Sequence, residues 1–280
     1  MKQYGILVGC NDFGVEGASL RGCINDLRGF YEMLATFFNY EGWEFDFLID
    51  QRNTAEAQRQ LIAKIISYAV SGDIVVLHNS SHGTKVPNGN KIESANCAYG
   101  FNWNKIPETF VLGSQYQELF KAAKPGVLIY FTTDSCCSGY MTRRGLLSKP
   151  EPENRVIVPK FVTQPADIQW KIEHLKKTGV VAPRAMIGEM VDVAFGSGCG
   201  PLETDYIADV GETDPTTGQQ TWFGAYSRNF RETALAYPGK SFAELMKITC
   251  SVLAHKQYEQ VPTTYGPSGI IDRPYLQRPA

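Results

Sequence analysis

GVLIYFTTDSCCSG, residues 126–139, is the segment from which the fold is best inferred. It opens with an apolar run, 126–132, that predicts a buried strand, and it ends in small polar residues around Cys136 and Cys137. Upstream, DIVVLHNSSHGT (73–84) has the same construction, with small residues around His82. Two buried strands that each lead into a small-residue turn are typical of a parallel sheet, whose functional residues gather at the carboxyl ends of the strands.

The rest of the chain alternates between strand-like and helix-like patterns. We expect strands at 4–9, 44–49, 73–78, 126–132, 190–196 and at the edge within 260–276, and helices that begin near 25–26 and 53–54 and at 115–123, 223–236 and 241–255. This alternation predicts an α/β fold with a mostly parallel central sheet and helices on both faces. Four prolines in 145–166 predict a long exposed loop, with a strand fragment at 156–162, and 211–220 predicts a turn.

The composition excludes several classes of protein. The chain has 280 residues, 43% of them hydrophobic and 20% charged, with a net charge of −2, which is an ordinary globular balance. The absence of a basic excess argues against nucleic-acid binding. No run of 18 apolar residues occurs, and the N-terminus lacks the pattern of a signal peptide, so we expect a cytoplasmic protein without membrane contact.

Seven cysteines are scattered along the chain. The odd number and the wide spacing argue against a disulfide framework. No CxxC pair occurs, and the four histidines do not fall at zinc-ligand spacing, so we expect no structural metal.

Cys136 and His82 are candidates for a nucleophile and its base. Both follow strands that are expected to be neighbours, so the histidine could deprotonate the thiol. The backbone N–H groups of Gly83 and Cys136 could then stabilise an oxyanion. Either side chain, taken alone, more often has a structural role, and their positions at matching strand ends strengthen the catalytic interpretation.

Five segments together resemble a known family. HNSSHGT (78–84) and DSCCSG (134–139) resemble the histidine and cysteine motifs of the metacaspases and bacterial caspase-like peptidases. RGCINDL (21–27), GSGCGPLETD (196–205) and QVPTTYG (260–266) resemble three further motifs, in the family's order. The resemblance implies a cysteine endopeptidase with Cys136 as nucleophile and His82 as base; Cys137 is the weaker candidate.

The resemblance also implies an architecture. The expected fold is a caspase-like three-layer α/β sandwich, formed by a single domain over 1–280. Its large-subunit-like part is 1–145, its linker loop about 146–184, and its small-subunit-like part 185–280. Members of the family are usually monomers, so a monomer is expected here.

The family's preference for cleavage after Arg or Lys maps onto Cys23, Asp26, Ser80 and Asp134 as the pocket for the basic side chain. Carboxylates bind a guanidinium or ammonium group strongly when the pocket is partly dry. Simpler roles exist for both acids, since Asp26 could cap a helix and Asp134 could fix a turn. Further along, Glu203, Asp205 and Asp209 could line the cleft, although exposure to solvent accounts for them more simply.

A basic preference makes exposed basic residues candidates for self-cleavage. After the cysteine motif these are Arg143, Arg144, Lys149 and Arg155. A solvated basic patch is the alternative explanation for each of them.

Many metacaspases need calcium, but the acidic ligands are missing here. Residues 88–104 contain a single acid, Glu93, and 140–144 contain none. Calcium requires several carboxylate or carbonyl oxygens, so we expect weak calcium dependence or none, and no required cofactor.

Two other functions remain to be weighed against the peptidase. One is a non-catalytic caspase-like scaffold or regulatory module. The other is a redox protein that uses Cys136 and Cys137, which is disfavoured because adjacent cysteines form a strained ring.

Overall fold

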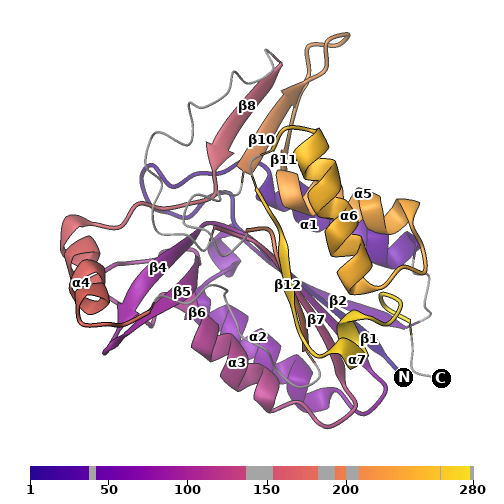
Figure 1. Ribbon diagram of the computed structural model, residues 1–280, viewed down its shortest axis with the longest axis horizontal. Helices are drawn as coiled ribbons and strands as arrows, with labels where there is room; N and C mark the ends of the chain where they lie inside the picture. Colours follow the sequence, from indigo (N-terminus) through magenta and orange to yellow (C-terminus); the bar gives the residue numbers. More distant parts are fainter. Residues whose placement is uncertain (38–41, 137–153, 182–192, 200–207, 259, 278–280) are drawn as a thin grey trace.

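A six-stranded sheet organises the molecule (Figure 1). The computed structural model describes residues 1–37, 42–136, 154–181, 193–199, 208–258 and 260–277. The strand order is β12-β9-β7-β3-β1-β2, and pairing is parallel except between β12 and β9. These strands are β1 (Gln3–Gly9), β2 (Trp43–Ile49), β3 (Ile74–Ser80), β7 (Leu128–Asp134), β9 (Val193–Ser197) and β12 (Thr263–Tyr265).

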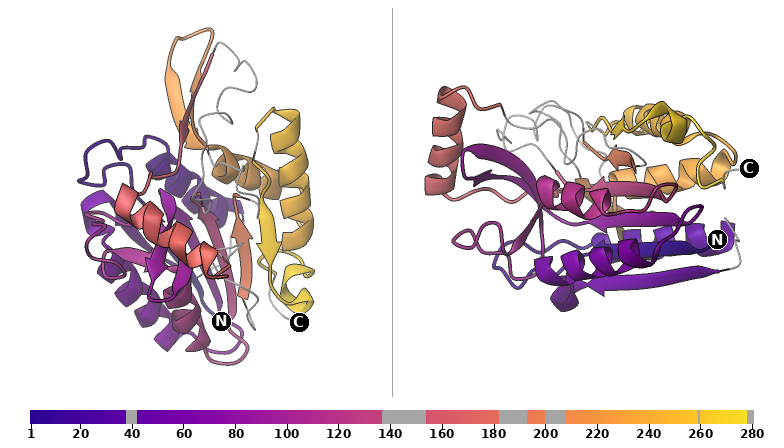
Figure 2. Two further views of the ribbon diagram at one scale, coloured as in Figure 1. Left: turned by 60° about the vertical axis from the view of Figure 1, so that its left-hand side comes forward. Right: turned by 90° about the horizontal axis from the view of Figure 1, so that it is seen from below.

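Helices cover both faces of this sheet (Figure 2). One face carries α1 (Cys23–Glu32), α5 (Ala225–Ala236), α6 (Phe242–His255) and α7 (Ser268–Ile271), and the other carries α2 (Ala55–Tyr68) and α3 (Gly113–Lys121). Successive residues of a strand pack on opposite faces of the sheet: Tyr130 packs with the first set of helices and Phe131 with the second. This arrangement confirms the predicted three-layer α/β sandwich.

Two three-stranded antiparallel sheets stand outside the central one. They are β4-β5-β6, formed by β4 (Gly83–Asn88), β5 (Lys91–Cys97) and β6 (Phe110–Leu112), and β11-β10-β8, formed by β8 (Arg155–Pro159), β10 (Ala208–Thr213) and β11 (Gln220–Gly224). Figure 1 shows β8, β10 and β11 rising together beyond the end of the central sheet. The sequence patterns missed β4, β5 and β6, because β4 and β5 are largely polar and β6 has only three residues.

Two local expectations need correction. Residues 154–166 are not an exposed loop, because they form β8, a buried Lys160 and the approach to α4 (Ala166–Lys177). The turn expected at 211–220 is limited to about 214–219, and the residues on either side are the strands of a hairpin. Both ends of the predicted linker, 146 and 184, lie outside the described residues.

Helix starts follow their capping residues. Thr54 accepts a hydrogen bond from the backbone N–H of Ala57, and Ser241 forms a capping box with Glu244, as is typical of helix N-termini. In contrast, α1 begins at Cys23 after Gly22, two residues earlier than expected. Asp26 therefore lies inside the first turn of α1 and is not its cap.

Phe131→Ala should lower the free energy of unfolding by about 3–5 kcal/mol, because it removes a buried ring from the centre of the core. Phe131 is fully buried, and its ring lies 4.7 Å from that of Tyr116 and 5.1 Å from that of Phe195. Urea denaturation measures the change. Tyr68→Ala is the control, since Tyr68 is 58% exposed and its loss should cost no more than about 0.5 kcal/mol. Equal effects of the two changes would contradict the assigned core.

Candidate active site

The carboxyl ends of β3 and β7 meet at one edge of the central sheet. Ser80 and Asp134 are partners in the parallel register of these strands. The segments that follow them, through Gly83 and Cys136, are in direct contact, since a Cβ atom on Gly83 would overlap the carbonyl oxygen of Cys136. Only glycine allows the two turns to approach this closely.

His82 is buried and held in one orientation. Its Nε2 atom lies 3.0 Å from the carbonyl oxygen of Ala18. A carbonyl can only accept, so Nε2 carries the proton and Nδ1 keeps its lone pair. Nδ1 is buried and makes no hydrogen bond with a described residue. Burial lowers the pKa of His82 to about 4, so the imidazole is neutral near pH 7 with a free basic nitrogen.

Polar side chains support the turn that holds Cys136. The hydroxyl of Ser135 donates to Asn96 Oδ1 over 2.6 Å and lies 2.6 Å from the hydroxyl of Thr133. Asn96 in turn donates to the hydroxyl of Tyr116, which donates to Gln58. Satisfied buried networks of this kind fix the backbone that they bond, so the orientation of residues 134–136 is set by β5 and α3.

One carbonyl oxygen receives two backbone N–H groups at this site. The carbonyl of Lys160 accepts from the N–H of Gly83 over 3.1 Å and from the N–H of Cys136 over 3.2 Å. Two converging N–H groups form the geometry that stabilises an oxyanion. The oxygen that they hold belongs to a peptide bond of the chain itself.

The ammonium group of Lys160 lies in a buried acidic pocket. Its Nζ atom is 2.9 Å from Asp26 Oδ2, 2.8 Å from Ser80 Oγ and 3.4 Å from Asp134 Oδ2. Lys160 and Asp134 are wholly buried, and only 1% of the Asp26 side chain is exposed. Burial alone would lower the pKa of Lys160, but the charges of Asp134 and Asp26 outweigh this effect and raise it. The lysine is therefore firmly charged.

Further groups complete this pocket. Ser227 donates to Asp134 Oδ2 over 2.6 Å, and the N–H of Gly224 donates to Asp26 Oδ1 over 2.8 Å. Burial raises the pKa of Asp134, while the charge of Lys160 opposes that rise. Cys23 is buried beside Lys160, and burial also raises the pKa of its thiol.

Residues 155–164 run past Cys136, and Lys160 contacts it through a backbone hydrogen bond. Before Lys160, β8 pairs antiparallel with β10, so that Val158 lies opposite Asp209. After Lys160, Phe161 forms a parallel bridge with Gly83, and the carbonyl of Val162 accepts from the hydroxyl of Thr84 over 3.3 Å. An extended segment bonded to sheet edges on both sides of a cysteine has the form of a bound peptide.

The structure brings together most of the candidate site residues. The backbone N–H groups of Gly83 and Cys136 converge on the carbonyl of Lys160, and His82 directly precedes Gly83 in the chain. Cys23, Asp26, Ser80 and Asp134 gather around the Lys160 side chain. Cys137, Arg143, Arg144 and Lys149 lie outside the described residues, as do Glu203 and Asp205. Of the simpler readings, helix capping by Asp26 is wrong, and solvation of Asp209 is wrong because that residue is wholly buried.

Three residues of the acidic pocket were not identified from the sequence: Lys160, Ser227 and Gly224. A signal existed for Lys160, which is the single cation in the otherwise apolar run VIVPKFV, 156–162. A lone charge in a buried pattern indicates a specific partner. Ser227 and Gly224 carry no comparable signal.

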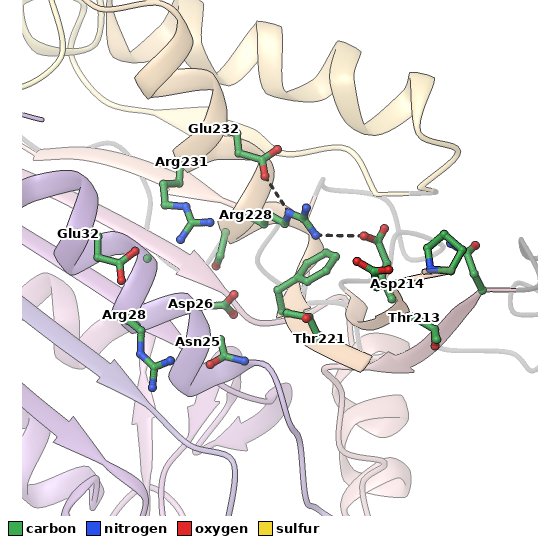
Figure 3. Close-up of a pocket in the computed structure, with 16 residues that line it drawn as sticks. Asn25, Asp26, Arg28, Glu32, Thr213, Asp214, Thr221, Arg228, Arg231 and Glu232 are labelled. Carbon is green, nitrogen blue, oxygen red and sulfur yellow. Dashed lines mark hydrogen bonds and ion pairs between the residues drawn. The ribbon is translucent and has the colours of Figure 1, made fainter. Parts of the chain in front are cut away.

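A second hollow lies on the other side of Asp26 (Figure 3). It measures about 550 Å³ and lies between α1, α5 and the hairpin of β10 and β11. Figure 3 shows a charged lining in which Arg228 pairs with Glu232 over 2.8 Å, and Arg228 also pairs with Glu212 over 3.1 Å. Neither Cys136 nor His82 lines it. The hollow is therefore separate from the turns that carry Cys136 and His82.

Among the described residues, no group of three or more His, Cys, Asp or Glu side chains is arranged to hold a metal ion. Within the same parts of the chain, every helix is too short or too polar to cross a membrane. Weak calcium dependence and a monomeric state stay predictions.

Comparisons with known proteins agree with this geometry. The family model Peptidase_C14, described as the caspase domain, matches residues 2–268. Metacaspase-4 of Arabidopsis thaliana is 30% identical over 146 residues, which cover 50% of this chain and 34% of that protein. Metacaspase-1 of Mycosarcoma maydis is 26% identical over 299 residues, with coverage of 93% and 69%. The chain spans between a third and about half of the length of the plant metacaspases that it matches.

Solved structures share the fold. The protein GSU0716 from Geobacter sulfurreducens superposes with a TM-score of 0.67 at 16% identity, over 100% of both chains. Caspase-1 from Spodoptera frugiperda superposes with a TM-score of 0.52 at 11% identity, over 95% of this chain and 86% of that one.

Lys160→Ala should loosen β8, because it removes the three contacts that anchor the end of this strand. Hydrogen exchange of the backbone N–H groups of 155–158 should accelerate by about 10- to 100-fold, since hydrogen bonds to charged groups contribute about 1.5–3 kcal/mol. Mass-spectrometric exchange measures this. Lys240→Ala is the control, as Lys240 forms an exposed pair with Glu244 over 2.7 Å. Unchanged exchange in 155–158 would show that Lys160 does not hold the strand.

Proposed function

This chain belongs to the caspase-domain family of peptidases, and we propose that it is a cysteine endopeptidase that cleaves peptide bonds after lysine or arginine. In this proposal Cys136 is the nucleophile and His82 is the general base. Residues Cys23, Asp26, Ser80 and Asp134 form the S1 pocket, which receives the side chain on the amino side of the cleaved bond.

The observation that carries the proposal is the position of Lys160. Its side chain lies among the pocket acids, and its carbonyl oxygen accepts from the N–H groups of Gly83 and Cys136. A single residue thus contacts both the specificity pocket and the oxyanion donors. This is the placement that a substrate's basic residue needs for attack by a thiolate at Cys136.

The reaction follows from the protonation states. Neutral His82 accepts the thiol proton of Cys136 at Nδ1, and Nε2 stays bonded to Ala18. The thiolate attacks the carbonyl carbon, and the oxyanion is held by the two N–H groups. The C–N bond breaks, the new amine takes the proton from His82, and a thioester remains. Water, deprotonated by His82, then hydrolyses the thioester and restores the thiol.

Self-cleavage fits the same geometry. We extend the proposal to the bond between Lys160 and Phe161, whose carbonyl is already held by the oxyanion donors. Arg143, Arg144 and Lys149 remain candidates for additional cuts.

Hydrolysis of fluorogenic peptides that end in Arg, Lys or Asp tests the activity. We expect cleavage after Arg and Lys only, because the buried acids of S1 repel aspartate, and equal rates with calcium and with chelator. Lys160→Ala should raise the initial rate, since it vacates S1, and Cys136→Ala should lower the rate by at least about 1000-fold. A folded protein that cleaves none of these peptides, even as Lys160→Ala, would favour the non-catalytic scaffold.

Incubation of the purified chain tests self-cleavage. Mass spectrometry should find one fragment that ends at Lys160 and another that begins at Phe161. Cys136→Ala and Lys160→Ala should both abolish this cut, while Arg155→Ala should preserve it because Arg155 lies outside S1. Fragments that end only at Arg143, Arg144 or Lys149 would show that the lysine in the pocket is not the cleaved residue.

A further inference from the structure

Asp209 is a wholly buried acid at the start of β10. Its Oδ2 atom accepts from the backbone N–H of Arg21 over 2.7 Å and of Gly22 over 3.0 Å. These two bonds fix the carboxylate at the start of α1. Its Oδ1 atom is buried and has no hydrogen-bond partner among the described residues. A buried carboxylate oxygen without a donor is costly and requires an explanation.

Asp209 lies beside the S1 pocket. Its partner across the pairing of β8 and β10 is Val158, two residues before Lys160. Residues that pair, and residues two apart on a strand, share a face, so the side chains of Asp209 and Lys160 lie on the same face. Its partner on β11 is Gly224, where a Cβ atom would overlap the Asp134 carboxylate and crowd the Lys160 ammonium. The charges of Asp209 and Lys160 also interact, because each shifts the pKa of the other toward its ionised form.

A lysine does not satisfy all the acceptors of this pocket. The three N–H bonds of an ammonium group point at Asp26, Ser80 and Asp134 Oδ2. Asp134 Oδ1 and Asp209 Oδ1 are left without donors. Three buried carboxyl groups therefore surround one positive charge. Burial raises the pKa of Asp134, and it raises the pKa of Asp209 to about 6.

We propose that Asp209 is a third acid of the S1 pocket and makes it select arginine over lysine. A guanidinium group has five N–H donors in a planar fork, two more than an ammonium group, and can bond two carboxylates at once. The two extra N–H groups donate hydrogen bonds to Asp209 Oδ1 and Asp134 Oδ1. Glycine at positions 22 and 224 lets these carboxylates lie directly against the backbone, since a Cβ atom at Gly22 would overlap Asp209 Oδ1 and one at Gly224 would overlap Asp134 Oδ2.

The inference rests on the proposed function, and the test separates the two. Two peptides that differ only in Arg or Lys are compared on the full chain carrying Lys160→Ala, with and without Asp209→Asn. Without the second change, kcat/KM for Arg should exceed that for Lys by at least about tenfold. With it, the ratio should fall to about 1, chiefly through the Arg peptide. Asp214→Asn is the matched control, because Asp214 is an exposed acid just after β10, and it should leave the ratio unchanged.

A pH series gives an independent measure should Asp209→Asn destabilise the chain. The groups that face Asp209 are Asp26, Asp134 and Cys23, and Lys160 is absent from the tested variant. Burial raises the pKa of Asp209 to about 6 in the presence of Lys160, and loss of the Lys160 charge raises this pKa further. Protonation of Asp209 removes its acceptor charge, so the Arg to Lys ratio should fall as the pH drops through this raised pKa. Changes at His82 affect both peptides and cancel in the ratio. The ratio of the Asp209→Asn chain should be flat over this range.

Calorimetric binding of the same peptides to Cys136→Ala/Lys160→Ala requires no hydrolysis. A preference for Arg that Asp209→Asn removes supports the inference, even where no peptide is cleaved and the proposed function fails. Equal binding of Arg and Lys, or a preference for Arg that survives Asp209→Asn, overturns it.

Discussion

The buried ammonium of Lys160 is the interaction on which this arrangement depends. Two strands and a helix deliver carboxylates and a hydroxyl to one dry point, where the buried carboxylates would be costly without the cation. Because α1 carries Asp26 and β7 carries Asp134, the ion pairs join the central sheet to the layer above it. The position of β8 on β10 follows from the same contacts.

The site separates two tasks between two parts of the chain. The large-subunit-like part supplies His82, Cys136 and the oxyanion donors through the ends of β3 and β7. The small-subunit-like part closes the acidic pocket through β10, β11 and the start of α5, which contribute Asp209, Gly224 and Ser227. In the proposed mechanism, residues at the ends of parallel strands carry out the chemistry, while recognition of the basic side chain needs both parts to be packed together.

Sequence patterns identified the strands and helices that are encoded by short stretches of the chain. Apolar runs predicted β1, β3 and β7, and parallel pairing then placed Ser80 beside Asp134. Patterns could mark Lys160 as a lone charge in an apolar run but could not identify its partners, because these are up to 134 positions away and no local rule connects them. Asp26 was interpretable as a helix cap because its actual partners, Ser80 on β3 and Gly224 on β11, are also far away in the sequence. The strand fragment predicted at 156–162 corresponds to β8, Arg155–Pro159, whereas β10 was not predicted because it is defined by its pairing.

The hydrogen bonds on both sides of Lys160 determine what a cut after this residue would release. A break between Lys160 and Phe161 would leave β8 paired with β10 on one side, and Phe161 and Val162 bonded to β4 on the other. Both pieces would stay in a single particle under native conditions. The new carboxylate of Lys160 would remain a tethered ligand at high effective concentration, in competition with any incoming peptide. The rate at which β8 dissociates would then determine the rate of activation.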